Sequence, residues 1–423
     1  MIRNKKILKL QKKKNTINQI ESILQPTKKK KMSEGKPIEC TAAVAYAPNK
    51  PLTIEKIIVE APKTDEVRVK ILKSALCHTD AFTLSGEDNE WPASDFKPVI
   101  LGHEAAGIIE SVGPEVTDLA VGDHVILLYT AECGECKFCL DDRTNLCIKV
   151  RSTQGKGVMP DGTTRFKNLK GEPIYHFMGC SAFSDYTVVS KHSAVKIDKA
   201  FDLEKAALLG CGVATGFGAA GYKGIGAAKK HNQITEGSSV AVFGLGAVGC
   251  SVLEGARAAG AKKIIAVDTN DKKEEWARSF GATDFVNPTK LPEGEDIVSK
   301  LVSMSDDGFG IDFTYDCTGN VNVMNNALMA SARGTGISTV IGVAPAGAQI
   351  SVRPFYLIVG RTWTGIAFGN IKGKSEMNKL IEASNQGILS LEKYITHKRE
   401  FKEINTAFED LHSGDCLRTV FDY

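Results

Sequence analysis

VAVFGLGAVG, residues 240–249, joins an apolar run to three glycines, Gly244, Gly246 and Gly249, in the spacing GxGxxG. An apolar helical pattern begins inside it at Ala247. The glycines of such a turn allow a tight bend and let a pyrophosphate approach the N-terminus of the following helix. A lone GxGxxG is weak evidence, because glycines recur in loops for turn geometry alone. Its value therefore depends on the elements around it.

Strands and helices alternate along this part of the chain. The strand-like runs are SSVAVFG (238–244), KKIIAVD (262–268), TDFVN (283–287), IDFTYD (311–316), ISTVIGV (337–343) and TWTGIAF (362–368). Helical patterns stand between them, from Ala247, over 271–280, over 295–303 and from Asn322. This alternation predicts a doubly wound parallel sheet covered on both faces, an α/β Rossmann domain over 213–367. A nucleotide-free sheet with a glycine turn is the weaker alternative.

The second strand ends in Asp268, 24 residues after Gly244. A carboxylate at this place accepts hydrogen bonds from the ribose hydroxyls of the adenosine. The residues that follow it are Thr269, Asn270 and Asp271, with no arginine to hold a 2′-phosphate. The pattern therefore favours NAD over NADP.

The region before residue 213 has a different texture. Short β-branched runs such as EVRVKILK (66–73), AAGIIESVG (105–113) and VGDHVILL (121–128) are separated by Gly, Pro and Asp. They predict a β-rich domain of short strands over 33–212. Past Phe368 we expect a helix over SEMNKLIEASNQ (375–386) and then a short tail, CLRTVFDY, with 368–423 returning to that first domain.

Charge is distributed unevenly along the 423 residues. Residues 1–32 hold ten Lys and one Arg against one acid, a net charge of +10, which leaves −7 for the rest of a chain whose total is +3. No apolar run approaches the roughly 20 residues that cross a bilayer. We therefore expect a cytoplasmic protein that binds neither nucleic acid nor membrane.

The basic segment 1–32 lacks the apolar core of a secretory signal. We interpret it as a disordered extension, or as translated sequence ahead of a start at Met32. A weak organellar presequence is the alternative, although such segments favour Arg and Ser over Lys. Eleven cysteines without a secretory signal indicate reduced thiols and metal rather than disulfides.

Four cysteines stand together in CGECKFCLDDRTNLC, at Cys133, Cys136, Cys139 and Cys147. The spacing C-x2-C-x2-C-x7-C differs from the ferredoxin pattern of an iron–sulfur cluster, which has a shorter last gap and a proline after the last cysteine. Four unmetallated thiols this close would oxidise readily. A closed set of four cysteines is typical of structural zinc, so we predict a zinc-stapled lobe over 133–147 that performs no chemistry.

A catalytic zinc needs three protein ligands and one open position. Candidates outside the lobe are Cys77 in LCHTDAF, His103 in LGHEAAG and Cys211 in LGCGVATG. Each alone would more often be a buried thiol or a hydrogen-bonded histidine. Asp80 could orient the histidine ligand from behind, and Glu104 could approach the metal when substrate leaves.

With these motifs in view, the chain from about Ala42 to Tyr423 resembles the zinc-containing medium-chain alcohol dehydrogenases. GHEAAGIIESVG (102–113) is similar to the zinc signature of that family. Within it, the chain most resembles class III, the glutathione-dependent formaldehyde dehydrogenases. The stretches that carry this likeness are CHTDAFTLSGED (77–88), CGECKFCLDDRTNLC, TQGKGVMPDGTTRF (153–166), GLGAVG, GRTWTGIAFG (360–369) and HSGDCLRTVFDY (412–423). The resemblance implies a GroES-like catalytic domain beside the Rossmann domain, and a homodimer.

The resemblance also implies roles for single residues. Cys77, His103 and Cys211 would hold the catalytic zinc with Glu104 nearby, and Thr79 would begin the proton relay. At the coenzyme, His78 and Arg418 would contact the pyrophosphate, and Asp268 with Lys273 the adenosine ribose. The backbone of Ile341, Gly342, Val343, Ile366, Ala367 and Phe368 would meet the nicotinamide end. The glycine turn would add Gly244, Leu245, Gly246, Ala247, Val248 and Gly249. Asp88, Glu90 and Arg151 match the positions with which class III binds glutathione; otherwise they would be a surface acidic loop and a surface cation.

Two positions depart from common patterns of the family. Phe82 stands where many ethanol-active relatives have a relay histidine, which implies that the proton leaves through water. Arg333 replaces a lysine often found near the coenzyme, which keeps the charge and changes the geometry.

The activity implied by the resemblance is NAD-dependent oxidation of S-(hydroxymethyl)glutathione to S-formylglutathione. Long-chain primary alcohol oxidation and S-nitrosoglutathione reduction would be further activities. A generic long-chain or aryl alcohol dehydrogenase is the nearest alternative. A non-catalytic NAD-binding relative is another, against which the intact set of metal ligands, Thr79 and the glycine turn argue.

Overall fold

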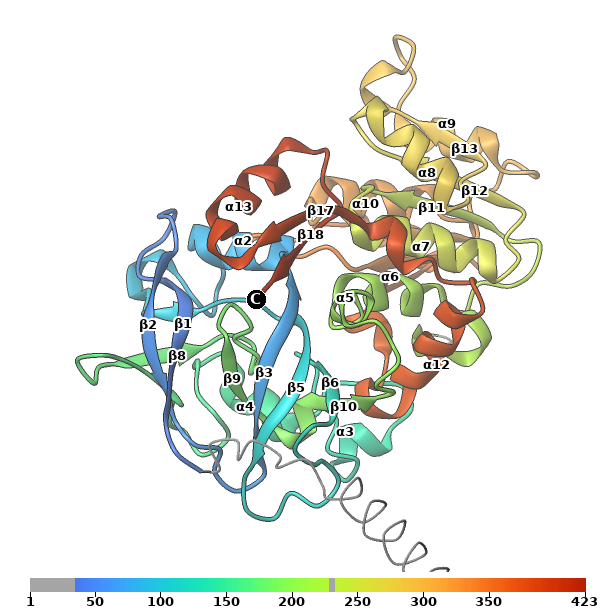
Figure 1. The fold of residues 1–423 in the computed structure, drawn as a ribbon. Helices are drawn as coiled ribbons and strands as arrows, with labels where there is room; N and C mark the ends of the chain where they lie inside the picture. Colours follow the sequence, from blue (N-terminus) through green and yellow to red (C-terminus); the bar gives the residue numbers. More distant parts are fainter. Residues whose placement is uncertain (1–34, 228–232) are drawn as a thin grey trace, which may run out of the picture. The chain divides into compact units, whose positions relative to one another are not determined.

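The computed structural model describes residues 35–227 and 233–423. The predicted basic extension, 1–32, lies outside the described residues. Figure 1 shows the described body with most of its helices and strands labelled. Among the residues described, no helix is both long and apolar enough to cross a membrane.

The Rossmann domain is built on a parallel sheet with the strand order β13-β12-β11-β14-β15-β16. Its strands are β11 (Ser239–Phe243), β12 (Lys263–Val267), β13 (Asp284–Val286), β14 (Phe313–Asp316), β15 (Ile337–Val340) and β16 (Thr362–Gly365). Each pair of neighbours runs parallel. The predicted doubly wound α/β sheet is confirmed, and each of the six predicted runs supplies one of these strands.

Helices cover both faces of this sheet (Figure 1). They are α7 (Ala247–Ala258), α8 (Glu274–Phe280), α9 (Ile297–Met304) and α10 (Val321–Ala330). Val240 and Val242 pack in the core that contains residues of α7 and α8, whereas Ala241 and Phe243 pack with residues of α9 and α10. Alternate side chains of a strand point to opposite faces, so β11 is apolar from Val240 to Phe243 because both of its faces are buried there.

The N-terminal region forms a β-rich domain, as predicted, in two sheets. Strands β1 (Ile38–Ala45), β2 (Thr53–Val59), β7 (Phe166–Asn168), β8 (Pro173–His176) and β4 (Val99–Ile100) close a barrel. The second sheet contains β10 (Ala194–Ile197), β6 (His124–Leu127), β5 (Glu104–Val112), β3 (Glu66–Ala75), β18 (Arg418–Asp422) and β17 (Ile395–Glu400), with β9 (Tyr186–Ser190) also paired to β3.

Helices and short 3-10 turns complete the described body. The remaining α-helices are α2 (His78–Ser85), α3 (Lys137–Leu140), α4 (Ile148–Gln154), α5 (Leu203–Leu208), α6 (Gly212–Ala220), α11 (Phe355–Ile358), α12 (Gly373–Asn385) and α13 (Ile404–Ser413). The 3-10 turns are η1 (Ala93–Asp95), η2 (Lys191–Ser193), η3 (Tyr222–Gly224), η5 (Asp271–Lys273), η6 (Pro288–Lys290), η7 (Phe368–Asn370), η8 (Leu391–Tyr394) and η9 (Phe401–Glu403).

The C-terminal region is more structured than the helix and short tail expected from the sequence. The predicted helix is present as α12, but β17 and α13 follow it, and the tail itself forms β18. Strand β18 pairs antiparallel with β3 and parallel with β17, which returns the end of the chain to the sheet of the first domain. The predicted border at residue 212 falls at the first residue of α6, and the border at 367 falls just before η7.

Candidate active site and metal clusters

A buried cluster is formed by Cys77, His103, Glu104 and Cys211. One ligand atom of each lies within 4.8 Å of those of the others. Cys77 precedes α2, His103 and Glu104 stand at the start of β5, and Cys211 precedes α6. Three segments far apart in the sequence therefore supply the atoms of one site.

Asp80 fixes the orientation of His103. Its Oδ1 lies 3.0 Å from His103 Nδ1 and accepts the backbone N–H of Gly102 at 2.9 Å. Its Oδ2 accepts the backbone N–H of Cys77 at 3.0 Å. The other ring nitrogen, His103 Nε2, is buried and has no hydrogen-bond partner within the described ranges. A free imidazole nitrogen beside two thiols is a donor set that fits catalytic zinc.

Glu104 and Arg418 form a buried ion pair beside this cluster. Arg418 Nε and Nη2 donate to the two Glu104 carboxylate oxygens, each at 2.8 Å, and Nη2 lies 3.5 Å from Cys77 Sγ. Burial raises the pKa of Glu104 to about 7 against the opposing effect of Arg418. The hydrogen bond with Cys211 holds the pKa of Cys77 well below its usual value, and Arg418 acts in the same direction. Arg418 was expected at the coenzyme pyrophosphate, and that role stays a prediction.

Gly212 makes room for this ion pair. A Cβ on Gly212 would lie 2.0 Å from Nη2 of Arg418, whose guanidinium is held in place by two hydrogen bonds to the Glu104 carboxylate. The backbone N–H of Gly212 donates to Glu104 Oε1 at 2.9 Å. Glycine after Cys211 therefore follows from the packing of a charged pair against the helix start.

Thr79 lies one residue into α2, with its hydroxyl 3.7 Å from Cys77 Sγ. His78, the other predicted residue of this turn, is exposed.

Two aromatic rings beside His103 were not predicted from the sequence. Tyr129 lies 5.7 Å and Phe177 lies 5.8 Å from His103 between ring centroids. No local motif marks either ring, because the folding of distant segments brings them to the site.

The glycine turn is shaped for close approach of a ligand. Gly244 has φ +89°, a left-handed conformation that favours glycine. A Cβ on Gly249 would lie 1.9 Å from the carbonyl oxygen of Gly244, whereas a Cβ on Gly246 would meet nothing within 4 Å. Gly244 and Gly249 are thus required by the fold, and the space at Gly246 is open for a pyrophosphate. Leu245, Ala247 and Val248 complete this turn and helix start.

Asp268 stands at the end of β12 and contacts the glycine turn. Its Oδ2 accepts the backbone N–H of Leu245 at 2.8 Å and lies 3.2 Å from Lys273 Nζ. Asp268 and Lys273, predicted together at the adenosine ribose, are thus neighbours. The other predicted coenzyme segments, 341–343 and 366–368, follow the adjacent strands β15 and β16. The C-terminal edge of such a sheet is where dinucleotides bind.

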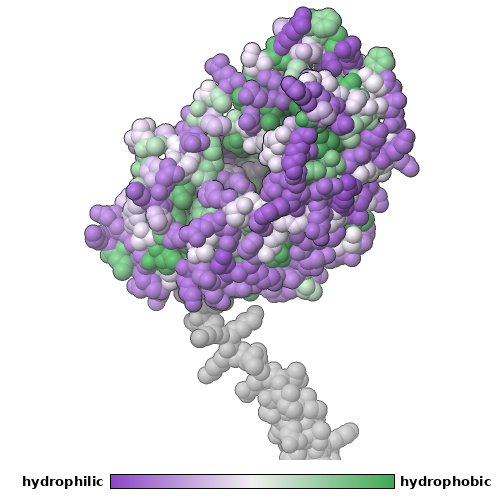
Figure 2. All heavy atoms as spheres, turned by 90° about the horizontal axis from the view of Figure 1, so that it is seen from above, coloured by the Kyte–Doolittle hydropathy of each residue, from purple (hydrophilic) through white to green (hydrophobic). Residues whose placement is uncertain are grey.

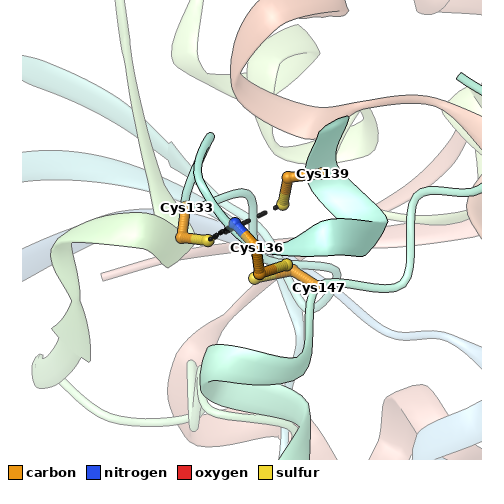
Figure 3. A group of neighbouring side chains, drawn as sticks. All are labelled: Cys133, Cys136, Cys139 and Cys147. Carbon is orange, nitrogen blue, oxygen red and sulfur yellow. Dashed lines mark hydrogen bonds between the residues drawn. The ribbon is translucent and has the colours of Figure 1, made fainter. Parts of the chain in front are cut away.

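Figure 3 shows the second cluster, formed by Cys133, Cys136, Cys139 and Cys147. One sulfur atom of each lies within 4.8 Å of the others, and the backbone N–H of Cys136 donates to Cys133 Sγ at 3.3 Å. Four converging thiols can fill all four coordination positions of a zinc ion and leave none for substrate, which fits structural zinc. The lobe is short and carries little apolar core of its own, so a metal is the natural means to hold it.

The three predicted glutathione residues lie near one another. Arg151, on α4, forms an ion pair with Glu90 whose shortest contact is 2.5 Å. Their side chains are 52% and 39% exposed. Asp88 accepts a hydrogen bond from Thr83 of α2 at 2.7 Å. A Cβ on Gly155 would lie 2.7 Å from the Glu90 carboxylate, so glycine there lets Glu90 reach the end of α4.

Comparison with known proteins assigns the two halves of the chain. Residues 63–199 match the alcohol dehydrogenase GroES-like domain family, and residues 247–386 match the zinc-binding dehydrogenase family. The chain is 59% identical over 387 residues to S-(hydroxymethyl)glutathione dehydrogenase of Saccharomyces cerevisiae, covering 91% of this chain and 97% of that one. It is 51% identical to alcohol dehydrogenase class-3 of Dictyostelium discoideum, covering 92% and 99%.

Solved structures show the same architecture. An alcohol dehydrogenase zinc-binding domain protein from Burkholderia ambifaria superposes with a TM-score of 0.81 at 32% identity, covering 92% of this chain and 99% of that one. Benzyl alcohol dehydrogenase from Acinetobacter calcoaceticus superposes with a TM-score of 0.80 at 29% identity, covering 91% and 99%. The barrel-containing domain and the Rossmann domain described above are thus the two domains of these enzymes.

Proposed function

The chain belongs to the zinc-binding alcohol dehydrogenases, and we propose that it oxidises S-(hydroxymethyl)glutathione to S-formylglutathione with NAD. The observation that carries this proposal is the buried cluster in which His103 Nε2 and two thiols converge, in a chain so similar to dehydrogenases of that substrate. S-(hydroxymethyl)glutathione forms when the thiol of glutathione adds to formaldehyde, so the activity removes formaldehyde.

The reaction takes a hydride and a proton from one substrate group, –S–CH2–OH, and leaves –S–CHO. Cys77, His103 and Cys211 would hold a zinc ion, which when bound supplies the Lewis acidity that lowers the pKa of a hydroxyl group. NAD, when bound at the glycine turn, accepts the hydride. Thr79, whose hydroxyl lies 3.7 Å from Cys77 Sγ, would accept the hydroxyl proton and pass it to water, since Phe82 offers no relay.

The residues behind the ligands hold them in place. Asp80 keeps the proton of His103 on Nδ1, so that Nε2 stays free to coordinate. Arg418 compensates the charge of Glu104, whose side chain is fully buried. Arg418 also lies against Cys77 Sγ and stabilises its thiolate.

Recognition of glutathione would use Arg151, Glu90 and Asp88. Glutathione carries two carboxylates and an ammonium group; Arg151 would pair with one carboxylate, and the two acids with the ammonium group. The Arg151–Glu90 pair is half exposed, and such pairs contribute only about 0–1 kcal/mol. A substrate carboxylate can therefore replace Glu90 on Arg151 at little cost.

A second copy of the chain is the partner that the sheet edge supports. Strand β16 is the last strand of the Rossmann sheet, and α11 beside it in sequence exposes Phe355, Leu357 and Ile358. A strand at the end of a sheet can pair with a strand of another chain, and antiparallel pairing of two identical end strands closes a twofold dimer. We expect Ile358→Glu to shift sedimentation of the protein from dimer to monomer; a monomeric wild type would contradict this assignment.

Further activities follow from the same site. Long-chain primary alcohols present a hydroxyl without the glutathione charges, and S-nitrosoglutathione presents those charges with a reducible group. We therefore infer slow oxidation of the former and NADH-dependent reduction of the latter.

We place the protein in the cytoplasm. The surface seen in Figure 2 is mostly hydrophilic and is hollowed near the middle.

The test is NADH formation from formaldehyde with and without glutathione. We expect turnover only when the thiol is present, with octanol oxidised slowly and ethanol poorly. If formaldehyde without glutathione, or octanol, were oxidised as fast as formaldehyde with glutathione, a generic long-chain or aryl alcohol dehydrogenase would be favoured. The similarity to benzyl alcohol dehydrogenase is the observation that supports this alternative. Zinc binding without any turnover would favour a non-catalytic relative.

A further inference from the structure

One side chain of the zinc lobe reaches out of the lobe. Asn145 stands two residues before Cys147 and is only 5% exposed. Its Nδ2 donates to the carbonyl oxygen of Ala367 at 2.8 Å and to that of Ile371 at 3.1 Å. A single amide thus contacts both ends of the segment 367–371, more than 220 residues away in the sequence.

The segment that Asn145 spans has an unfavourable backbone. Phe368, Gly369 and Asn370 have φ of 49°, 58° and 59° in succession. Left-handed φ is easy for glycine and tolerated by asparagine, but costly for phenylalanine. Such a conformation persists only when its surroundings hold it. The turn closes on itself through Asn370 N–H to Ala367 O at 2.9 Å, and Asn145 adds the bond that joins its two ends.

The turn is also packed against the active site. A Cβ on Gly369 would lie 2.5 Å from the carbonyl oxygen of Thr215 in α6, the helix that begins after Cys211. The Phe368 ring meets Tyr129 at 5.2 Å, and Tyr129 in turn meets His103 at 5.7 Å. A displacement of the turn would therefore move the predicted nicotinamide segment and the aromatic rings around His103.

A second bond ties the same segment to the lobe. Lys372, only 7% exposed, donates from Nζ to the carbonyl oxygen of Cys139. Its backbone N–H donates to Glu376 Oε2 at 3.0 Å, which anchors it at the start of α12. The lobe thus holds segment 367–372 through two carbonyl groups of the segment and through the side chain of Lys372. These are hydrogen bonds in a buried contact, and such bonds define the position of the segment closely.

We propose that Asn145 is a positioning residue for the nicotinamide end of the coenzyme. By bridging the ends of the left-handed turn 368–370, it fixes the backbone that follows β16 at the edge where the nicotinamide would lie. The zinc lobe therefore acts on the reaction through Asn145, although it performs no chemistry. This inference rests on the proposed function, because it needs a nicotinamide coenzyme at that edge.

Two ligands separate positioning from general stability. NADH carries the nicotinamide, whereas ADP-ribose fills the same adenosine and pyrophosphate site without it. In Asn145→Asp, which keeps the side-chain shape but cannot donate, we expect the Kd of NADH to rise roughly tenfold, the effect of losing about one strong hydrogen bond. We expect the Kd of ADP-ribose to stay within about twofold, with full zinc content. Asn145→Ala should likewise weaken NADH binding and leave ADP-ribose binding unchanged. Because this variant adds no charge, it shows whether the effect of Asn145→Asp comes from the buried charge instead of the lost donor.

Leu146→Ala is the matched control, since Leu146 is the neighbouring lobe residue and its side chain is 47% exposed. It should leave both dissociation constants unchanged. Equal weakening of NADH and ADP-ribose in both Asn145 variants, or no weakening of either, would overturn the proposal while the proposed function stands. Wild-type protein that binds no NADH would overturn both.

Discussion

The two cysteine clusters bring similar donors together by different routes. The lobe takes its four thiols from fifteen consecutive residues, and two of these thiols are partly exposed. The buried cluster takes two thiols, an imidazole and a carboxylate from three distant segments. Every donor of the lobe is a thiol, whereas the buried cluster combines different donors and has the Thr79 hydroxyl 3.7 Å from Cys77 Sγ. A local cluster can be closed by its own loop, but an open site must be held by the whole fold.

The largest effect should come from the distributed cluster. Cys211→Ala removes one of three ligands, so we expect no measurable turnover in a protein that still folds and binds NADH. Steady-state assays and NADH fluorescence titration measure the two properties. Cys180→Ala is the matched control, because Cys180 is another fully buried thiol outside both clusters. Residual turnover in Cys211→Ala close to that of Cys180→Ala would exclude Cys211 as a ligand.

The local cluster should respond in stability. Cys136→Ala removes one of the four zinc ligands of the lobe. Because the fold of a small lobe depends on its metal, the loss of zinc should destabilise it. We expect a melting temperature lower by roughly 5 °C or more, equivalent to about 4 kcal/mol or more in a chain of this size. Differential scanning calorimetry measures it. Arg143→Ala, an exposed lobe residue paired with Asp141, is the control. An unchanged melting temperature together with full zinc content would contradict the structural role of the lobe.

The rim beyond both clusters should affect substrate choice. Arg151→Ala removes a charge-assisted bond to a glutathione carboxylate, which costs about 1.5–3 kcal/mol, or roughly ten- to a hundredfold in kcat/KM. We expect this loss for S-(hydroxymethyl)glutathione and little change for octanol. Lys149→Ala, on the same helix and paired with Glu135, is the control. Equal losses on both substrates would mean that Arg151 supports the fold or the lobe instead.

The smallest predicted effect concerns the coenzyme. Asp268→Asn removes the negative charge that repels a 2′-phosphate and weakens the bonds to the ribose. We expect NAD to bind about tenfold more weakly, and NADP to become a usable coenzyme. The kcat/KM ratio of the two coenzymes measures it, with Asp271→Asn, an exposed neighbour paired with Lys290, as the control. A wild type that already prefers NADP would contradict the role of Asp268.

The same contrast explains what could be predicted from the sequence. The lobe and the glycine turn are local: the spacing of the four cysteines indicates zinc, and the glycine spacing between a strand and a helix indicates a dinucleotide. The strands of the Rossmann sheet are buried on both faces and stand out as apolar runs. Cys77, His103 and Cys211 could be named as candidate ligands, but their assignment to one zinc ion depended on the family resemblance, because nothing in the spacing links them.

What could not be predicted depends on pairing across the chain. Strand β18 is stabilised by β3, about 345 residues earlier, so its short run looked like a tail. The ion pair of Arg418 with Glu104 spans 314 residues, and the contact of Asn145 with Ala367 spans 222. Each is decided by the register of elements that local pattern does not specify. Helix α13 has a polar surface and few local signals, and its apolar residues pack on the barrel side of the body.

Zinc content measured beside turnover tests most directly whether the two clusters hold separate metals with separate tasks. We expect about two zinc ions per subunit in the wild type and about one in both Cys211→Ala and Cys136→Ala. Turnover should be absent in Cys211→Ala and should persist, reduced, in whatever Cys136→Ala protein remains folded. A wild type with a single zinc per subunit, or a Cys211→Ala protein with full zinc content and undiminished turnover, would contradict the assignment.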